Sequence, residues 1–172
     1  VLFRSKLMSI EIREIETGWV FEAQQFFEFP RAELFEFFGD AANLEAITPP
    51  WLNFKVITPQ PIEMQVGALI DYKLKLHMIP IKWRTEISVW EPPVRFTDSQ
   101  LKGPYKKWIH EHTFIEQDDG TLMIDRVEYD VPLGRLAHSL AVRKDLEKIF
   151  AYRQKVLTHR FSQPHRQTEL ED

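Results

Sequence analysis

The chain contains no cysteine, only six glycines, and no long apolar run in its 172 residues. The lack of cysteine excludes disulfide bonds, thiol nucleophiles and cysteine-based zinc sites. No segment approaches the roughly 18 consecutive apolar residues that a membrane-spanning helix requires, so we expect no integral membrane association. A chain without disulfides fits a reducing compartment, and we expect a cytoplasmic location.

An excess of positive charge is also lacking, because 22 lysines and arginines stand against 26 acidic residues and the net charge is −4. No continuous basic surface is expected to neutralise a phosphate backbone, so nucleic acid is not an expected partner. Large apolar side chains are abundant instead, since 44% of the chain is hydrophobic and it contains 13 phenylalanines. This composition favours one folded domain with a bulky interior.

The periodic patterns divide the chain into one domain and two ends. Residues 15–161 carry the apolar periodicity and are expected to form the domain. Residues 1–14 read as an N-terminal extension, of which 1–7 precede a plausible natural start at Met8 and can be non-native. Residues 162–172 are polar and are expected to form a flexible tail.

Alternation of apolar and polar side chains predicts seven strands. In the clearest of them, Ile70, Tyr72 and Leu74 alternate with charged residues, which is the period of a half-buried strand. Short connections such as Asp118-Asp119-Gly120 make the sheet antiparallel from the second strand onward. The seven predicted strands are 17–29, 52–57, 68–78, 81–91, 94–101, 106–116 and 121–131.

Helical patterns complete an α+β arrangement. Two short helices, 30–39 and 41–47, follow the first strand, and residues 135–161 read as one long C-terminal helix of roughly 40 Å. A curved seven-stranded antiparallel sheet wrapped around that helix buries every apolar face and leaves a cavity between sheet and helix. The apolar stripe of the long helix is Leu136, Leu140, Leu146, Ile149, Phe150, Val156, Leu157 and Phe161.

Several local motifs accompany this element order, namely Pro50-Trp51, Trp90-Glu91-Pro92-Pro93, Gly103-Pro104-Tyr105 and Trp108-Ile109-His110-Glu111-His112. Together with the element order, these motifs resemble the START/SRPBCC superfamily of helix-grip proteins. That superfamily includes lipid-transfer domains, birch-pollen-allergen-like proteins and polyketide cyclases. The resemblance covers about residues 15–161 and is similar to the bacterial ligand-binding or cyclase/dehydrase-like branch. It implies a pocket for a small molecule, and the scaffold serves carriers, sensors and enzymes alike.

Polar residues in phase with an apolar face are the candidates for the pocket, because a buried polar group needs a partner. His110 and His112 alternate with two isoleucines, and we expect the histidine face to point inward. The segments 101–105 and 49–51 are expected to flank the entrance. The predicted ligand-binding residues are Trp83, Gln100, Trp108, His110, His112, Asp125, Tyr129 and Arg153.

Three uses of the polar groups stay open. Aspartates beside histidines in a water-poor site can act as general acids and bases, so Asp98, Asp125, His110 and His112 are the catalytic candidates. For each residue singly, a structural or ligand-orienting role is favoured, for example a buried pair between either aspartate and Arg153. The two histidines with one aspartate could hold a metal, but no metal or cofactor is expected because the third ligand is not convincing.

The sequence therefore predicts first a non-enzymatic protein that binds a small, largely hydrophobic molecule such as a lipid, an aromatic compound or a polyketide. The alternative is an enzyme of the cyclase/dehydratase type that uses the histidines and aspartates of the pocket. A protein-interaction module would need an exposed apolar patch, which the pattern does not show. A monomer or a homodimer fits either hypothesis.

Overall fold

A computed structural model describes residues 9–162, which form one antiparallel sheet and the helices that cover it. The order of strands in the sheet is β1-β2-β8-β7-β6-β5-β4-β3. The expectations for residues 1–8 and 163–172 lie outside the described residues. The strands are β1 (Ser9–Ile15), β2 (Gly18–Phe27), β3 (Lys55–Val56), β4 (Leu69–Leu76), β5 (Ile79–Glu91), β6 (Arg95–Lys102), β7 (Lys107–Gln117) and β8 (Gly120–Asp130).

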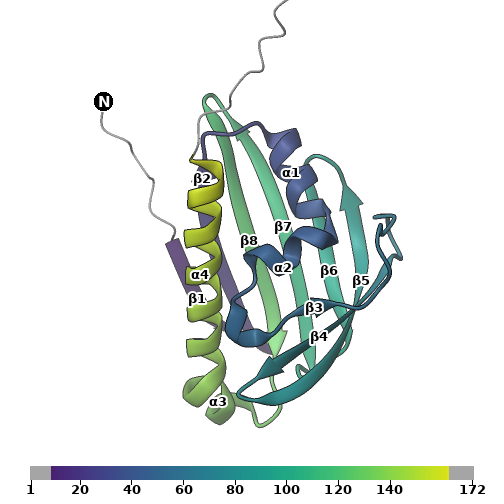
Figure 1. Cartoon of the computed structure of the whole chain (residues 1–172). Coiled ribbons are helices and arrows are strands. Elements are labelled where there is room, and N and C mark those ends of the chain that lie inside the picture. Colours follow the sequence, from purple (N-terminus) through teal and green to yellow (C-terminus); the bar gives the residue numbers. More distant parts are fainter. Residues whose placement is uncertain (1–8, 163–172) are drawn as a thin grey trace, which may run out of the picture.

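The helices lie on one face of the curved sheet. In Figure 1 the long α4 runs in front of β2 and β8, while α1 and α2 lie over the middle of the sheet. The predicted α+β helix-grip fold is confirmed. Among residues 9–162, no helix is both long and apolar enough to cross a membrane. The helical segments are α1 (Arg31–Gly39), η1 (Ala41–Asn43), α2 (Leu44–Ile47), η2 (Pro50–Leu52), α3 (Gly134–Ala137), the π-helical turn η3 (His138–Val142) and α4 (Arg143–Phe161).

The sheet has eight strands where the sequence predicted seven. The additional strand is β1, which includes residues 9–14 of the expected N-terminal extension and pairs with β2 along its whole length. None of its residues is fully buried, although Ile10 and Ile12 pack against the core. The alternation of Ile10 and Ile12 with polar residues is short, since Glu14 follows in the position of the next apolar residue, and it was not recognised as a strand.

The C-terminal helix is less regular than predicted. A π-helical turn at His138–Val142 separates α3 from α4, and its wider turn shifts the phase of the side chains before it. As a result Leu136 and Leu140 are 64% and 67% exposed instead of buried, while His138 points inward. The prediction for α4 itself is confirmed, because Leu146, Phe150 and Leu157 are buried.

The hairpin between β4 and β5 turns earlier than the sequence predicted. β4 ends at Leu76, and His77 and Met78 form a two-residue turn with φ angles of 48° and 68°. Turns of this kind need positive φ at both central positions, where asparagine and glycine are the usual residues. The sequence therefore held no turn signal at this position.

A β-bulge in β5 decides where Trp90 points. The register with β6 shifts between Ile87 and Val89, so Ser88 is the extra residue and the alternation of faces changes after it. Trp90 consequently packs against Phe35 and Phe96 in the core. Its sequence position, out of phase with Trp83, is explained by this bulge.

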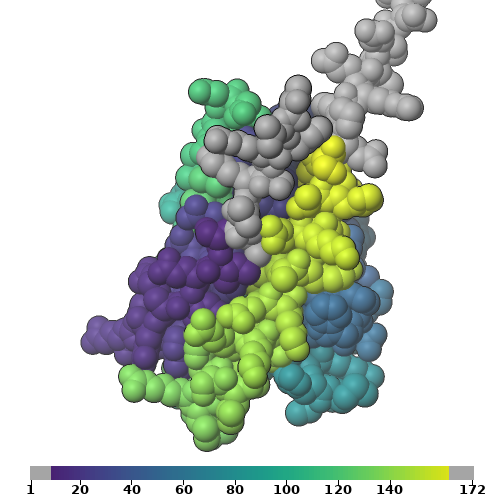
Figure 2. Space-filling view, turned by 90° about the vertical axis from the view of Figure 1, so that its left-hand side faces the viewer, coloured from purple at the N-terminus to yellow at the C-terminus, as the bar shows by residue number. Residues whose placement is uncertain are grey.

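The inward face of β7 is the one expected from the sequence. His110, His112 and Phe114 are at most 6% exposed, whereas Ile109 and Ile115 are 38% and 42% exposed. Figure 2 shows α4 along the outside of the molecule, between the first strands and the chain around α2 and η2. One side of α4 thus faces solvent, and the other closes the space above the two histidines.

Candidate functional site

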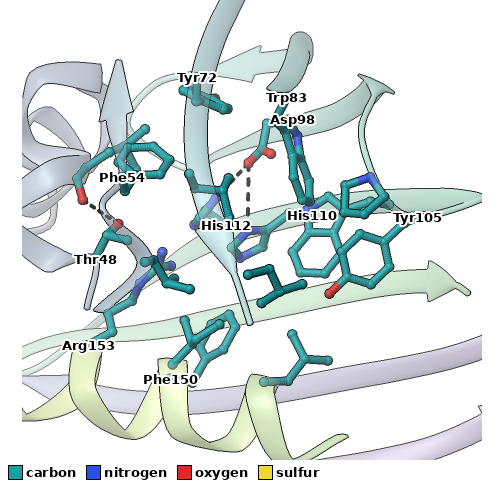
Figure 3. Close-up of a pocket in the computed structure, with 18 residues that line it drawn as sticks. Thr48, Phe54, Tyr72, Trp83, Asp98, Tyr105, His110, His112, Phe150 and Arg153 are labelled. Atoms are coloured by element: carbon teal, nitrogen blue, oxygen red, sulfur yellow. Dashed lines mark hydrogen bonds and ion pairs between the residues drawn. The ribbon is translucent and has the colours of Figure 1, made fainter. Parts of the chain in front are cut away.

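A cavity of about 170 Å³ lies between the sheet and α4. Its walls come from α2 and η2, from β4 and β5, from the loop after β6 and from α4, and they are largely apolar (Figure 3). A cavity near 150 Å³ accommodates a single benzene ring, so the inner chamber has the size of a one-ring molecule. The apolar lining residues are Leu44, Leu52, Phe54, Tyr72, Leu74, Leu76, Trp83, Pro104, Tyr105, Trp108, Leu146, Ile149 and Phe150.

Three aromatic rings form one corner of the cavity. The ring centroid of Trp83 lies 5.6 Å from that of Tyr105 and 5.4 Å from that of Trp108, and the last two are 4.6 Å apart. The indole N–H of Trp83 donates to the Thr85 hydroxyl at 3.2 Å. Gln100 holds the loop, because its amide donates to the Tyr105 carbonyl at 2.8 Å. The Trp83 indole and the Gln100 amide are thus satisfied, and ring surface is left for a ligand.

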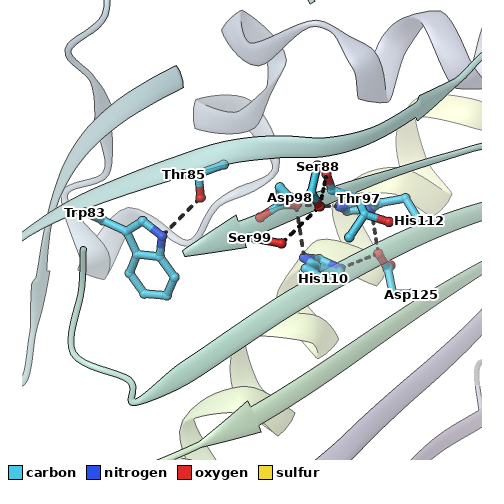
Figure 4. A network of polar contacts seen from close by, with 9 residues as sticks. All are labelled: Trp83, Thr85, Ser88, Thr97, Asp98, Ser99, His110, His112 and Asp125. Carbon is cyan, nitrogen blue, oxygen red and sulfur yellow. Dashed lines mark hydrogen bonds and ion pairs between the residues drawn. The ribbon is translucent and has the colours of Figure 1, made fainter. Parts of the chain in front are cut away.

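At the sheet side of the cavity two histidines and two aspartates form a closed cluster (Figure 4). Direct cross-strand pairing places Asp98 of β6 opposite His110 of β7, and Asp125 of β8 opposite His112. Asp98 Oδ2 lies 3.1 Å from His112 Nε2 and 3.8 Å from His110 Nδ1. Asp125 Oδ1 lies 2.8 Å from His110 Nε2 and 2.9 Å from His112 Nδ1. Each imidazole therefore lies between the same two carboxylates.

Burial and mutual charge set the protonation of this cluster. Burial alone would raise the pKa values of Asp98 and Asp125, but the two histidines outweigh it and lower both. Burial lowers the pKa of His110, and the neighbouring charge on His112 lowers it further. Burial also acts to lower the pKa of His112, but the two aspartates outweigh it and raise that pKa. At neutral pH the cluster therefore holds two carboxylates and a neutral His110, and His112 is the more basic of the two histidines.

Arg153 brings a positive charge from α4 to the cavity. Figure 3 shows it rising from the helix toward the strands that carry the histidines. Its Nε and Nη1 are buried, and no group within residues 9–162 accepts a hydrogen bond from them. The predicted buried pair of Arg153 with an aspartate is not formed as a direct ion pair among residues 9–162, where both aspartates contact the histidines, but the charge of Arg153 helps to lower the pKa of Asp98. A buried guanidinium with unbonded donors is costly unless a ligand supplies an acceptor.

Three groups of the cluster can hold a metal ion. One ligand atom each from Asp98, His110 and His112 can be chosen so that all three lie within 4.8 Å of one another. Two imidazoles and one carboxylate are a common ligand set for divalent transition metals.

The predicted ligand-binding residues divide into two groups. Trp83, Trp108, His110, His112 and Arg153 line the cavity, as does the catalytic candidate Asp98. The other three do not belong to its lining. Asp125 lies behind the histidines, Gln100 braces the loop, and the fully buried Tyr129 shares a 2.9 Å hydrogen bond with His138 Nε2. These three can influence a ligand only through the residues that they hold.

Several lining residues were not predicted from the sequence to belong to the pocket. Phe54, Leu146, Ile149 and Phe150 border the cavity, but their pattern is that of ordinary core residues. Core and cavity wall are equally apolar, so periodicity cannot separate them.

An outer groove of about 480 Å³ adjoins the cavity and shares Leu52, Leu76 and Ile149 with it. His77 at the tip of the β4–β5 hairpin reaches across this groove, and its Nε2 lies 2.7 Å from Asp145 Oδ2 of α4. Trp51 borders the groove, in line with the expected place of the entrance.

The comparisons with known proteins agree with this architecture. Residues 27–151 match the family of polyketide cyclases/dehydrases and lipid transport proteins, and the chain belongs to that family. A protein from Arthrobacter aurescens, solved by NMR, has a TM-score of 0.68 at 12% identity, with 92% of this chain and 96% of that chain covered. Ara h 8.0201 has a TM-score of 0.56 at 15% identity, with 81% and 97% covered. At these identities the likeness shows the fold alone.

A third similar structure belongs to a longer chain. It is a nucleoside-diphosphate sugar epimerase from Corynebacterium glutamicum, with 27% identity and a TM-score of 0.56. The match covers 80% of this chain but only 28% of the epimerase chain. No curated protein matches the sequence. Membership of the family points to a small hydrophobic ligand without saying which one.

Proposed function

We propose that the protein binds a compact organic anion, with its ring in the inner cavity and its negative group at Arg153. The observation that carries this proposal is an apolar chamber of about 170 Å³ bordered by a guanidinium whose buried Nε and Nη1 have no partner among residues 9–162. An anionic oxygen placed there would receive charge-assisted hydrogen bonds, which are the stronger kind.

The shape of the chamber supports a flat, ring-containing ligand. Trp83, Tyr105 and Trp108 offer rigid aromatic walls that lose little rotamer freedom when a ring packs on them. Pockets for drug-sized ligands measure about 300–1,000 Å³, so a lipid chain or a multi-ring polyketide would have to extend into the outer groove. The aromatic class is therefore favoured over the lipid class for the buried part of the ligand.

Isothermal titration calorimetry with benzoate and benzyl alcohol tests the proposal, because the two probes share a ring and differ in charge. We expect benzoate to bind at least about 10-fold more tightly, since a hydrogen bond to a charged group contributes about 1.5–3 kcal/mol. Arg153→Met should abolish this preference. The matched control is Arg160→Met on the same helix, where the guanidinium lies over Phe37, which is not part of the cavity wall.

Two results would contradict the proposal. One is that neither probe binds, and the other is that Arg153→Met keeps the preference for benzoate. Loss of the preference in the Arg160→Met control would likewise mean that α4, rather than one guanidinium, determines the selectivity.

The second candidate function is an enzyme of the cyclase/dehydratase type. It is favoured by His110 and His112, whose rings lie side by side at the cavity with centroids 3.8 Å apart and whose pKa values are shifted in opposite directions, lowered for His110 by burial and raised for His112 by the two aspartates. A neutral imidazole can remove a proton while its neighbour donates one. Mass spectrometry of β-keto thioester probes after incubation separates the two functions, because a carrier returns the probe unchanged.

A further inference from the structure

The inner nitrogens of the two cavity histidines face one carboxylate. His112 Nε2 and His110 Nδ1 lie 3.1 Å and 3.8 Å from Asp98 Oδ2. Atoms that bind the same Zn²⁺ at about 2.0–2.2 Å are separated by roughly 3–3.5 Å in tetrahedral geometry. Ligand atoms taken one from each residue all lie within 4.8 Å of one another, so the set approaches the spacing of ligands around one ion, and side-chain rotations would have to close the remaining distance.

The outer nitrogens of the same histidines face a second carboxylate. Asp125 Oδ1 lies 2.8 Å from His110 Nε2 in a hydrogen bond, and 2.9 Å from His112 Nδ1 at an angle that falls outside hydrogen-bond geometry. In metal sites, a ligating histidine commonly donates its other N–H to a carboxylate, which fixes the tautomer and orients the ring. Asp125 can serve both histidines in this way, which would explain a buried aspartate that does not itself line the cavity.

Position and charge also fit an ion. Asp98, His110 and His112 all line the cavity, so an ion bound by them would keep an open position toward the chamber. Asp98 and Asp125 together supply the two negative charges that a divalent ion balances. Strand pairing holds the whole set, since β6, β7 and β8 are adjacent in the sheet.

We propose that Asp98, His110 and His112 bind one divalent transition-metal ion of the Zn²⁺ type, with Asp125 orienting both histidines from behind. Three protein ligands and one open position are the arrangement of a metal that acts on a bound molecule, either by polarising its oxygen or by activating water. The proposal does not depend on the aromatic anion, because the ion is held by the protein alone.

Calorimetric titration of chelator-treated protein with Zn²⁺, followed by visible absorption of the Co²⁺ form, tests the site. We expect saturable binding of one ion per chain and a Co²⁺ spectrum of low coordination number. His112→Gln should abolish this binding. Asp125→Asn should weaken it by about 10–100-fold, as for other carboxylates that orient a ligating histidine.

The control is His77→Gln, which removes the exposed histidine of the other histidine–aspartate pair, His77 with Asp145. This variant should bind Zn²⁺ as the wild type does. The proposal is overturned if the folded wild type takes up no stoichiometric ion, or if His112→Gln binds as tightly as the wild type. It is also overturned if His77→Gln removes the binding. Circular dichroism of each variant ensures that only folded protein is compared. The titration of the wild type tests the proposal by itself, even if a variant does not fold.

Discussion

At the scale of single residues, His138 is a histidine of a different kind from the pair at the cavity. Its ring stacks on Trp19 with centroids 4.1 Å apart and planes 6° apart, and its Nε2 shares a hydrogen bond with the Tyr129 hydroxyl. Burial lowers its pKa, the positive charge of Arg143 lowers it further, and Glu14 acts in the opposite direction. The fold therefore holds His138 in its neutral form.

This neutral histidine predicts a pH dependence of stability. Because the pKa of His138 is lower in the folded chain than its ordinary value of 6.5, the unfolded chain binds more protons in the window below that value. The stabilising contribution is fully present above about pH 6.5 and is lost as the pH falls toward the folded pKa. We expect the free energy of unfolding of the wild type to fall relative to that of His138→Phe between about pH 7 and pH 5.

Urea denaturation at several pH values measures this difference. His138→Phe keeps a ring against Trp19 and removes the titrating group. The variant also loses the hydrogen bond to Tyr129, but this lowers its free energy of unfolding by the same amount at every pH. A difference between the two proteins that does not change with pH would contradict a neutral His138.

For single residues, the sequence predicted the direction of a side chain correctly where that direction depends only on alternation along a strand. The inward direction of His110 and His112 follows from period-two alternation, and the structure confirms it. The partner of Arg153 could not be read in the same way, because the distance between α4 and the strands depends on how the helix packs. That packing leaves the guanidinium beside the cavity and both aspartates with the histidines.

At the scale of elements, α1 is held to the sheet by a cluster of phenylalanines. Phe114 of β7 is fully buried, and its ring contacts those of Phe35 and Phe38 at centroid distances of 5.4 Å and 5.6 Å. Truncation of such a side chain loses its transfer free energy and leaves a cavity. The attachment of α1 therefore depends strongly on this one position of β7.

We expect Phe114→Ala to lower the free energy of unfolding by about 3–5 kcal/mol. The matched control is Ile115→Ala, the next residue along β7, whose side chain is 42% exposed and should contribute about 1 kcal/mol or less. Guanidinium denaturation of both variants gives the comparison. Equal losses of unfolding free energy in the two variants would contradict a β7 with one buried and one exposed face.

Element boundaries were predictable where a residue type marks them and unpredictable where geometry alone does. Gly39 ends α1, and the Asp118–Gly120 turn joins β7 to β8, as expected from their sequences. The turn at His77 and Met78 carries no such residue and was missed, whereas the bulge at Ser88 was indicated only by the changed phase of Trp90 relative to Trp83. The π-helical turn was invisible for the same reason, since its sequence is ordinary for an α-helix.

At the scale of the whole molecule, β1 closes one edge of the sheet. It pairs with β2 throughout and contributes Ile10 and Ile12 to the core cluster around Trp19 and Phe21. Without β1, the backbone groups of β2 that face it would be unpaired. Exposed edges of this kind join with other strands, and β1, which becomes the edge strand itself, carries the charged residues Glu11, Arg13 and Glu14 that disfavour such pairing.

A chain that begins at Glu16 should therefore be less stable, by about 2–4 kcal/mol for two largely apolar side chains and their pairing. It should also associate in a concentration-dependent manner. Denaturation and sedimentation velocity measure the two effects. The control is a chain that lacks only residues 1–8 and keeps β1. A Glu16 chain as stable and as monodisperse as this control would show that β1 is dispensable.

The overall architecture was the most predictable level, because a curved antiparallel sheet and one long helix leave few ways to bury their apolar faces. The count of strands was not, because an edge strand contributes few buried residues. The volume of the cavity could not be predicted at all, since it depends on how far each aromatic side chain reaches into the space above the sheet.

The cavity is built on two supports of unequal rigidity. The histidines and aspartates stand on three adjacent strands joined by backbone hydrogen bonds, whereas Arg153, Ile149 and Phe150 stand on α4, which meets the sheet through side chains. Substitutions along the helix can thus alter the size and polarity of the chamber while the geometry of the strand residues is preserved. The fold thus places the groups that set the size of the chamber and the groups that carry its charge cluster on separate elements.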